Sequence, residues 1–316
     1  MDPIPDDEEV TRRLRRLETF FDLKALAGAK ADQKTIHEYY RANQFAYSHF
    51  HSKNNVLHMG ISEDGRFKED DFWYQARHIE RLLPRGGTCL ELAAGRAANS
   101  AWLAQKRGGS RFEAQDLSDV QLKYARKAER KYQNLKVVKG DFHDLSDYVE
   151  SRFDIVFVVE ALCYSTDKKL VFDEVFRVLK PGGFFVVYDG YADRRIATRS
   201  EDEMRAARLL ERGMAVPRFE PYSDVVAKAK EAGFDVQAEE NLSQEILPTC
   251  ERHERRAAKL MDMGFAGKMV IKMLEKPVVY NVVVGYLFPI LMANRVFSYR
   301  ATSFVKPGAR SWRDRD

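Results

Sequence analysis

Residues 88–99 combine an acidic residue with a run of small residues, a pattern suited to binding a nucleoside. The apolar residues up to Leu92 are expected to form a strand. Ala93-Ala94-Gly95 would then let the backbone turn tightly into a helix with free N–H groups. Asp116 follows Gly95 at close to the offset of about 20 residues at which an acidic side chain reaches ribose hydroxyls. The pattern therefore predicts the nucleoside-binding half of a Rossmann-like sheet.

The same segment argues against a dinucleotide. Ala93 and Ala97 occupy positions where the dinucleotide fingerprint has glycines, and only Gly95 remains. The two methyl groups would hinder the close approach of the backbone to a pyrophosphate. Since no hydride-acceptor dyad is evident either, an NAD-dependent oxidoreductase is disfavoured.

The motifs that follow resemble, in order, those of the class I S-adenosylmethionine-dependent methyltransferases. In that family an acidic residue precedes a small-residue turn, as Glu91 precedes residues 93–95. Gly140-Asp141-Phe142 ends the expected third strand, and residues 152–167 contain a near-continuous apolar run typical of a central parallel strand. Lys180-Pro181-Gly182-Gly183 separates a helix from the next strand. Four matches in the right order are far more specific than any one alone.

The resemblance implies that the cofactor is S-adenosylmethionine. Glu91 would meet its α-amino group, whereas Asp141 and Phe142 would meet the adenine amino group and ring. The alternative for Glu91 is a buried carboxyl group that only local hydrogen bonds satisfy. The cofactor-binding residues predicted in this way are Glu91, Ala93, Gly95, Asp116, Leu117, Gln121, Asp141, Phe142 and Glu160.

Within the family, the chain looks most similar to the sterol side-chain methyltransferases. Those enzymes also run from a Tyr-Tyr pair, here Tyr39-Tyr40, through an aromatic stretch to a His-Phe turn, here His49-Phe50. Residues 159–163, VEALC, resemble their Ile-Glu-Ala-Thr-Cys block, and Gln121 matches a glutamine in their second helix. Tyr164 departs from the pattern because those enzymes carry a histidine there.

This resemblance covers roughly residues 35–240 and implies C-methylation of an isoprenoid or sterol-like alkene. Such a reaction forms a carbocation, which aromatic faces and a carboxylate can stabilise before a base removes a proton. Glu160 is the expected carboxylate, and the aromatic or proton-relay candidates are Tyr164, Tyr39, His49 and Tyr188. The alternative for each is a packing role.

Two other functions stay open from the sequence. The same residues could serve an O- or N-methyltransferase of a small natural-product metabolite, or the chain could be a catalytically inactive nucleoside-binding protein. No metal is required for methyl transfer. His49, His51 and His58 are not expected to form a metal site, because His49 and His51 would diverge on a helix.

The composition favours a cytoplasmic enzyme with no nucleic-acid partner. The 316-residue chain has 52 Lys and Arg against 48 Asp and Glu, a formal net charge of +4. Cys89, Cys163 and Cys250 have neither disulfide nor metal-ligand spacing, as expected for buried thiols in a reducing compartment. The acidic sequence of residues 1–10 lacks the apolar core of a signal peptide.

These features predict a Rossmann-like α/β fold with a seven-stranded, mostly parallel sheet and helices on both faces. Residues 7–26 have helical periodicity and are expected to form a separable amphipathic helix that packs on a partner surface or on its own domain. Residues 297–307 are expected to supply a seventh, antiparallel strand. The predicted organisation is a helical cap at 1–80, a methyltransferase core at 81–242, a helical insertion at 243–296 and the last strand and tail at 297–316.

The insertion contains an uncharged apolar segment, Pro277–Ala293, which is shorter than the 18 or more apolar residues of a spanning helix. It is expected to be a lid over an apolar pocket, a contact in a homo-oligomer, or a patch that touches a membrane surface. As a lid it would wall the pocket of a lipophilic acceptor with Val283, Tyr286, Leu287 and Ile290.

Overall fold

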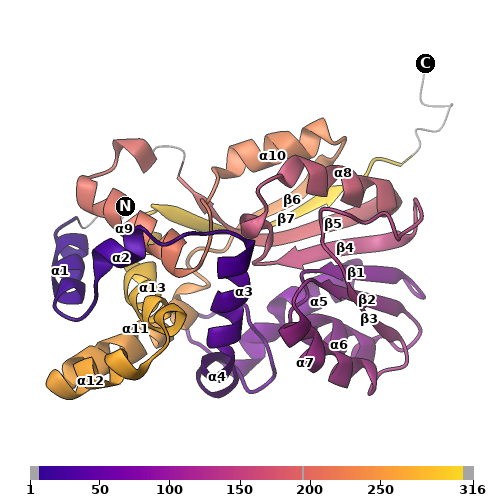
Figure 1. The fold of residues 1–316 in the computed structure, drawn as a ribbon. Coiled ribbons are helices and arrows are strands. Elements are labelled where there is room, and N and C mark those ends of the chain that lie inside the picture. The colour runs from indigo at the N-terminus through magenta and orange to yellow at the C-terminus, as the bar shows by residue number, and fades with distance from the viewer. Residues whose placement is uncertain (1–6, 194–195, 309–316) are drawn as a thin grey trace.

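A computed structural model describes residues 7–193 and 196–308, so the ends of the predicted cap and tail, residues 1–6 and 309–316, lie outside the described residues. Seven strands form one sheet in the order β3-β2-β1-β4-β5-β7-β6 (Figure 1). The strands are β1 Thr88–Leu92, β2 Arg111–Asp116, β3 Leu135–Lys139, β4 Phe153–Val159, β5 Leu179–Ala192, β6 Asp235–Asn241 and β7 Phe297–Val305.

The predicted fold class is confirmed. The pairs among β1 to β5 are parallel, and β7 is antiparallel to both β5 and β6. The predicted antiparallel strand at 297–307 is therefore present as β7, which lies between β5 and the edge strand β6. The remaining domain boundaries stay a prediction.

Helices cover both faces of the sheet because its central strands alternate between two apolar cores. In β4, Ile155 and Phe157 join one core, whereas Val156 and Val158 join the other. The helices and helical turns are α1 Asp7–Glu18, α2 Leu23–Ala27, α3 Gln33–Ala42, α4 Gln44–Ala46, η1 Tyr47–His51, η2 Glu69–Trp73, α5 Tyr74–Leu82, α6 Ala98–Lys106, α7 Asp119–Glu129, η3 Leu162–Tyr164, α8 Lys168–Val178, η4 Ile196–Thr198, α9 Glu201–Gly213, α10 Tyr222–Glu231, α11 Leu247–Asp262, α12 Phe265–Met273 and α13 Lys276–Ala293.

The N-terminal helix differs from the prediction in two ways. The segment 7–26 forms two helices, and Asp22 begins the second by accepting a hydrogen bond from the Ala25 N–H. The first helix, α1, packs on its own domain, as one of the two expected arrangements has it, and is therefore not a separate unit. Its buried Leu14 and Leu17 belong to the same apolar core as α9 and α13, and Arg13 donates a hydrogen bond to the Tyr286 carbonyl.

The apolar segment 277–293 lies in α13, which has 18 residues and Pro289 in its interior. In the described part of the chain, α13 is the one helix long and apolar enough to cross a membrane by length and composition alone. Val283, Leu287 and Leu291 are fully buried within the protein, so much of this apolar surface packs in the core. In Figure 1, α13 lies beside α9 and α11.

Candidate active site

A cavity of about 640 Å³ opens at the carboxyl ends of the central strands. Its walls come from the sheet on one side and from α3, η1, α11 and α13 on the other. The structure brings together eleven of the sequence-predicted residues in this lining: Tyr39, Glu91, Ala93, Gly95, Asp116, Leu117, Gln121, Asp141, Phe142, Glu160 and Tyr164.

The turn from β1 into α6 has an unusual backbone. Ala93, Gly95 and Ala97 have φ angles of 48°, 56° and 57°, in the left-handed region. A side chain at Gly95 would bring its Cβ within 2.9 Å of Leu57 Cδ1. Alanines in this conformation are strained, and such strain is concentrated at functional sites. The small residues thus make the tight turn that the sequence predicts.

Asp116 ends β2 beside this turn and is tied to it. Its Oδ2 accepts a hydrogen bond of 2.7 Å from the Gly95 N–H, and its Oδ1 accepts one of 2.7 Å from the Ser118 N–H. Burial raises the pKa of Asp116 to about 6, against the lowering effect of these hydrogen bonds. Each carboxylate oxygen has a second lone pair, so both can still accept a hydroxyl donor.

Glu91 also lines the cavity, but its carboxyl group holds the start of α6. Its Oε2 accepts hydrogen bonds from the Ser100 N–H at 3.1 Å and from the Ser100 hydroxyl, and its Oε1 accepts one from the Asn99 amide at 3.2 Å. Burial raises the pKa of Glu91 to about 7. Local hydrogen bonds therefore satisfy the buried carboxyl group, which is the alternative stated for Glu91 above. The role of Glu91 toward a cofactor stays a prediction.

One polar group at this end of the cavity, the amide of Gln121, points to a ligand. The Gln121 side chain is 2% exposed, and neither atom of its amide has a hydrogen-bond partner in the described structure. A buried amide in this state requires an explanation, and a bound ligand supplies one. At the end of the neighbouring strand, Asp141 Oδ1 accepts hydrogen bonds from the backbone N–H of His143 at 3.0 Å and from its Nδ1 at 2.7 Å.

Glu160 follows β4 and is fixed from two distant parts of the chain. Its Oε1 accepts hydrogen bonds from the Met59 N–H at 2.8 Å and from the Tyr299 hydroxyl at 2.9 Å. Its backbone has a φ of 53°, which is costly for a residue with a side chain. Burial raises the pKa of Glu160 to about 7, and the charge of Asp189 acts in the same direction. The carboxyl group can therefore take up or release a proton near neutral pH.

Four tyrosines surround one side of the cavity: Tyr39, Tyr40, Tyr47 and Tyr164. The Tyr40 ring lies edge-on to Tyr39 and Tyr164, with centroids 5.2 and 6.0 Å apart. The Tyr39 and Tyr47 hydroxyls are 3.1 Å apart. Burial raises the pKa of Tyr47 to about 12 and that of the others in the same direction, so these hydroxyls are neutral. Their ring faces can stabilise a positive charge.

Helix α13 lines the cavity with a face other than the predicted one. Its cavity-lining residues are Asn281, Val284, Gly285 and Phe288, which recur at helical spacing. The predicted wall of Val283, Tyr286, Leu287 and Ile290 is wrong, since none of the four is in the lining. Val283 and Leu287 pack instead in the protein core.

The structure does not bring His49 to the cavity. The residue lies in η1, a π-helical turn, where it is exposed and stacks on Phe45. The turn directs Tyr47 and His51 inward instead, and His51 Nδ1 lies 3.2 Å from His253 Nε2. Among the residues that the structure describes, no group of three or more His, Cys, Asp or Glu side chains could hold a metal ion.

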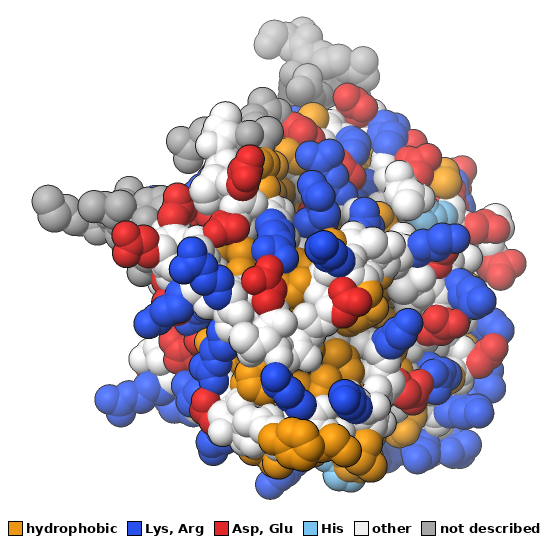
Figure 2. Space-filling view, turned by 60° about the vertical axis from the view of Figure 1, so that its left-hand side comes forward, with side chains coloured by type: hydrophobic (Ala, Val, Ile, Leu, Met, Phe, Trp, Pro, Cys, Tyr) orange, Lys and Arg blue, Asp and Glu red, His pale blue; other side chains and the backbone are white. Residues whose placement is uncertain are grey.

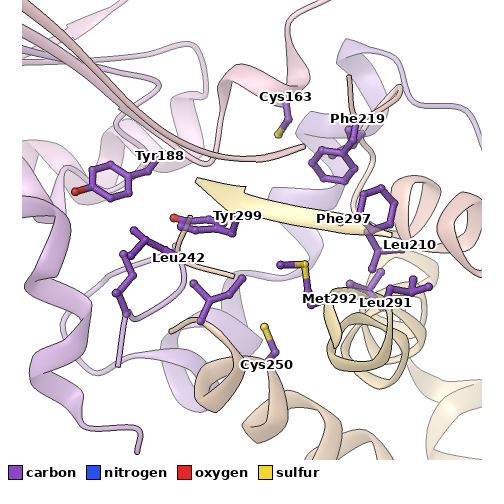
Figure 3. Close-up of a cluster of buried hydrophobic side chains, with 14 of the residues drawn as sticks. Cys163, Tyr188, Leu210, Phe219, Leu242, Cys250, Leu291, Met292, Phe297 and Tyr299 are labelled. Atoms are coloured by element: carbon purple, nitrogen blue, oxygen red, sulfur yellow. The ribbon is translucent and has the colours of Figure 1, made fainter. Parts of the chain in front are cut away.

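Tyr188 is likewise outside the cavity lining. Figure 3 shows it at the edge of a buried apolar cluster, with its hydroxyl pointing away from Cys163 and Phe219. That hydroxyl lies 2.5 Å from His78 Nδ1. Tyr188 is therefore a core residue with a satisfied hydroxyl. Tyr299, in the same cluster, is the tyrosine that reaches Glu160.

The comparisons with known proteins agree with this geometry. Residues 90–187 match the family model described as a methyltransferase domain. The sterol 24-C-methyltransferase of Saccharomyces cerevisiae is 27% identical over 227 residues, which are 67% of this chain and 58% of the yeast protein. The chain thus contains a methyltransferase domain, and it is similar to the sterol methyltransferases. It spans less than two thirds of the length of this relative.

Solved structures show the same fold. The cyclopropane synthase MmaA2 of Mycobacterium tuberculosis has a TM-score of 0.67 and 14% identity, with 89% of this chain and 98% of that chain covered. Geranyl diphosphate C-methyltransferase of Streptomyces coelicolor, in complex with Mg²⁺, geranyl diphosphate and S-adenosyl-L-homocysteine, has a TM-score of 0.63 and 14% identity. The match covers 88% of this chain and 100% of the Streptomyces coelicolor chain. At these identities the likeness concerns the fold.

Proposed function

We propose that this protein is an S-adenosylmethionine-dependent C-methyltransferase of a neutral, lipophilic alkene of the isoprenoid or sterol-like class. One observation carries the proposal. A buried carboxyl group poised near neutral pH, Glu160, and a cluster of tyrosine rings line the same cavity as the nucleoside-binding residues. A carboxylate and aromatic faces are what the formation and collapse of a carbocation require.

The residues at the β1 and β2 end of the cavity fit S-adenosylmethionine. The Asp116 carboxylate can accept hydrogen bonds from the two ribose hydroxyls, and the orphaned amide of Gln121 lies within the same lining. Asp141 and Phe142 would meet the adenine. When bound, the cofactor supplies an electrophilic methyl group, and the task of the chain is to align the acceptor with it and exclude water.

In the proposed reaction the tyrosine cluster holds the acceptor alkene and stabilises the positive charge that develops on it. Glu160, held by Met59 and Tyr299, accepts the proton that the methylated acceptor loses. A raised pKa suits this role because the ideal catalytic base has a pKa near the working pH.

The charge of the cavity supports a neutral acceptor. Arg96 is the one Lys or Arg side chain in the described lining. Its guanidinium already contacts Gln44 at 2.6 Å and Ser48 at 2.9 Å and stacks over the Tyr124 ring. Burial also lowers the pKa of His51 and His253, which are thus neutral. Apart from His37, whose charge acts on Asp116, a diphosphate would find few of the cationic partners that phosphate oxygens need.

Names of related proteins point in the same direction. The yeast relative is a sterol 24-C-methyltransferase, and the two structural neighbours act as a geranyl diphosphate C-methyltransferase and a cyclopropane synthase. Carbon methylation is common to the first two. Of these substrates, a neutral sterol-like acceptor agrees best with the small number of cationic side chains in the cavity lining.

The test is a methyl-transfer assay with S-adenosylmethionine and a panel of acceptors, followed by mass spectrometry and NMR of the product. We expect one added carbon at the alkene of a neutral sterol or isoprenoid, and no product from geranyl diphosphate. Methylation of oxygen or nitrogen on a small metabolite would contradict the proposal. Cofactor binding by calorimetry without turnover on any acceptor would instead favour the nucleoside-binding protein.

A further inference from the structure

Helix α12 presents an apolar face to the solvent. Phe265 is 79% exposed and Met273 is 83% exposed, and Met269 and Val270 lie on the same side at helical spacing. These are large apolar side chains in neighbouring turns of one short helix. Met263, just before the helix, is 52% exposed as well. A gathered set of this kind marks an interaction surface, whereas single exposed apolar residues are ordinary.

The opposite face of α12 is packed firmly on the protein. Gly267 is buried so close to α11 that a Cβ there would lie 2.1 Å from the Leu260 carbonyl oxygen. Ile271 is buried one turn later. The helix is thus held in place by one face, while the described residues leave the other largely exposed. The exposed apolar face is therefore a fixed feature of the fold.

The charges around this face are basic. Lys268 and Lys272 are exposed along one flank of α12, and residues 263–274 contain no Asp or Glu. The two acids at its ends are already paired: Asp262 with Arg16 at 2.5 Å and Glu275 with Arg41 at 2.5 Å. Figure 2 shows hydrophobic side chains gathered along the lower edge of the molecule, on the side where α12 lies in Figure 1, with Lys and Arg side chains above them.

We infer that α12 docks the protein onto the surface of an anionic lipid bilayer. Apolar side chains on one face would enter the boundary between head groups and acyl chains, and the flanking lysines would reach the phosphates. The helices on either side of α12 both line the cavity, α11 through Cys250 and His253 and α13 through Phe288. Docking here would therefore hold the cavity near the bilayer. The inference goes beyond the proposed reaction and does not depend on it.

Vesicle co-sedimentation of the full chain tests this inference. We expect binding to vesicles of phosphatidylcholine mixed with phosphatidylserine, weaker binding to phosphatidylcholine alone, and a loss of binding as salt is raised. The variant Phe265→Ser/Met273→Ser should need about tenfold more lipid for half-binding. Lys268→Glu/Lys272→Glu should remove the preference for the anionic lipid.

A matched control replaces two exposed apolar residues elsewhere, Val149→Ser/Leu170→Ser, which are 68% and 42% exposed. It should bind vesicles as the unaltered chain does. Because all the altered side chains are exposed, thermal unfolding should change little. If Phe265→Ser/Met273→Ser bound vesicles as well as the unaltered chain does, the inference would be overturned. It would also be overturned if light scattering showed a dimer that this variant dissociates and no form of the protein bound lipid. The exposed face of α12 would then join two copies of the chain.

Discussion

Buried carboxyl groups line the cavity where a cation is expected. Glu91, Asp116, Glu160 and Asp189 all have a pKa raised to about 6 or 7, in each case mainly by burial. Asp189, which no sequence motif indicates, accepts hydrogen bonds from the Cys163 and Gly190 N–H groups. A ligand with a sulfonium and an ammonium group would favour the ionised carboxylates. The electrostatics of these residues therefore suit the proposed cofactor better than any anion.

Asp116 gives the most direct test of cofactor binding. Asp116→Ala removes the carboxylate expected on the ribose hydroxyls, and a hydrogen bond to a charged group contributes about 1.5–3 kcal/mol. The affinity for S-adenosylmethionine should fall about ten- to a hundredfold in isothermal calorimetry. The control Asp119→Ala removes a largely exposed carboxylate paired with Lys139, and should bind as the unaltered chain does. Unchanged affinity in folded Asp116→Ala would remove Asp116 from the site.

Glu160 is expected to control turnover and its pH dependence. Glu160→Gln keeps an acceptor for Met59 and Tyr299 but cannot take up a proton. Turnover should fall at least about a hundredfold while cofactor affinity changes little. In the unaltered chain turnover should rise with pH through about 7, because the base acts in its ionised form. The measurement is the initial rate at pH values from about 5.5 to 8.5, a range that covers the titration of Glu160.

The same pKa predicts an opposite effect on stability. The folded pKa of Glu160 is raised from 4.5 to about 7, so the stability it contributes is full below the unfolded value and is lost as pH rises through 7. Glu160→Gln should therefore gain in melting temperature, relative to the unaltered chain, as the pH is raised. Glu231→Gln, an exposed site on α10, should show no such trend.

In the turnover experiment, equal losses of turnover and cofactor affinity in Glu160→Gln would make Glu160 a binding residue.

At the scale of elements, α13 divides its two faces between the core and the acceptor. Phe288→Ala shortens a cavity-lining side chain, and an apolar contact of this size contributes about 1.5–3 kcal/mol when fully made. The Michaelis constant for a long apolar acceptor should rise about tenfold or more, with the cofactor affinity unchanged. The control is Ile290→Ala on the same helix, whose side chain lies outside the lining. Equal effects of both variants would show that α13 acts only through packing.

The first helix is expected to contribute to global stability. Leu14 is 1% exposed in the core shared with α9 and α13. Leu14→Ala should therefore lower the free energy of unfolding by about 2–5 kcal/mol in urea titrations. Arg12→Ala, at a side chain 79% exposed, should change it by less than about 0.5 kcal/mol. A loss below about 1 kcal/mol at Leu14 would support the separable helix that the sequence suggested.

The sequence predicts local features well. It does not predict which side of an apolar helix faces the cavity, or which residues far apart in the sequence come into contact. The strand and turn around Gly95 follow from short motifs. The cavity face of α13 could not be found, because the helix is apolar all round and its periodicity favours no side. The sequence favours His49 over Tyr47 because nothing in its pattern indicates a π-helical turn. Tyr299 reaches Glu160 across 139 residues of sequence, beyond any local signal.

In the whole molecule the cavity joins two parts of the chain. The sheet supplies the predicted nucleoside-binding residues, while the segment that leads into α3 and the helix itself contribute Ala31, Asp32 and His37 to the same lining. His37 is near enough to Asp116 for its charge to lower the pKa of that carboxyl group. A bound cofactor would therefore contact both the sheet and the helical cap, and binding to the folded state alone stabilises whatever the ligand holds.

This arrangement predicts that the cofactor protects the link between α2 and α3. Lys30 and Lys34 are exposed trypsin sites on either side of the lining residues 31–33. With S-adenosylmethionine at about 100 times its Kd, local opening should be suppressed and cleavage at both sites slowed about tenfold or more, as followed by mass spectrometry. Cleavage at Lys230 on α10, which is exposed and outside the lining, should keep its rate. Asp116→Ala should lose the protection at the same cofactor concentration, because its affinity is lower. Equal cleavage rates with and without cofactor, in a chain that calorimetry shows to be saturated, would mean that the sheet binds the cofactor alone and that the cap serves only the acceptor.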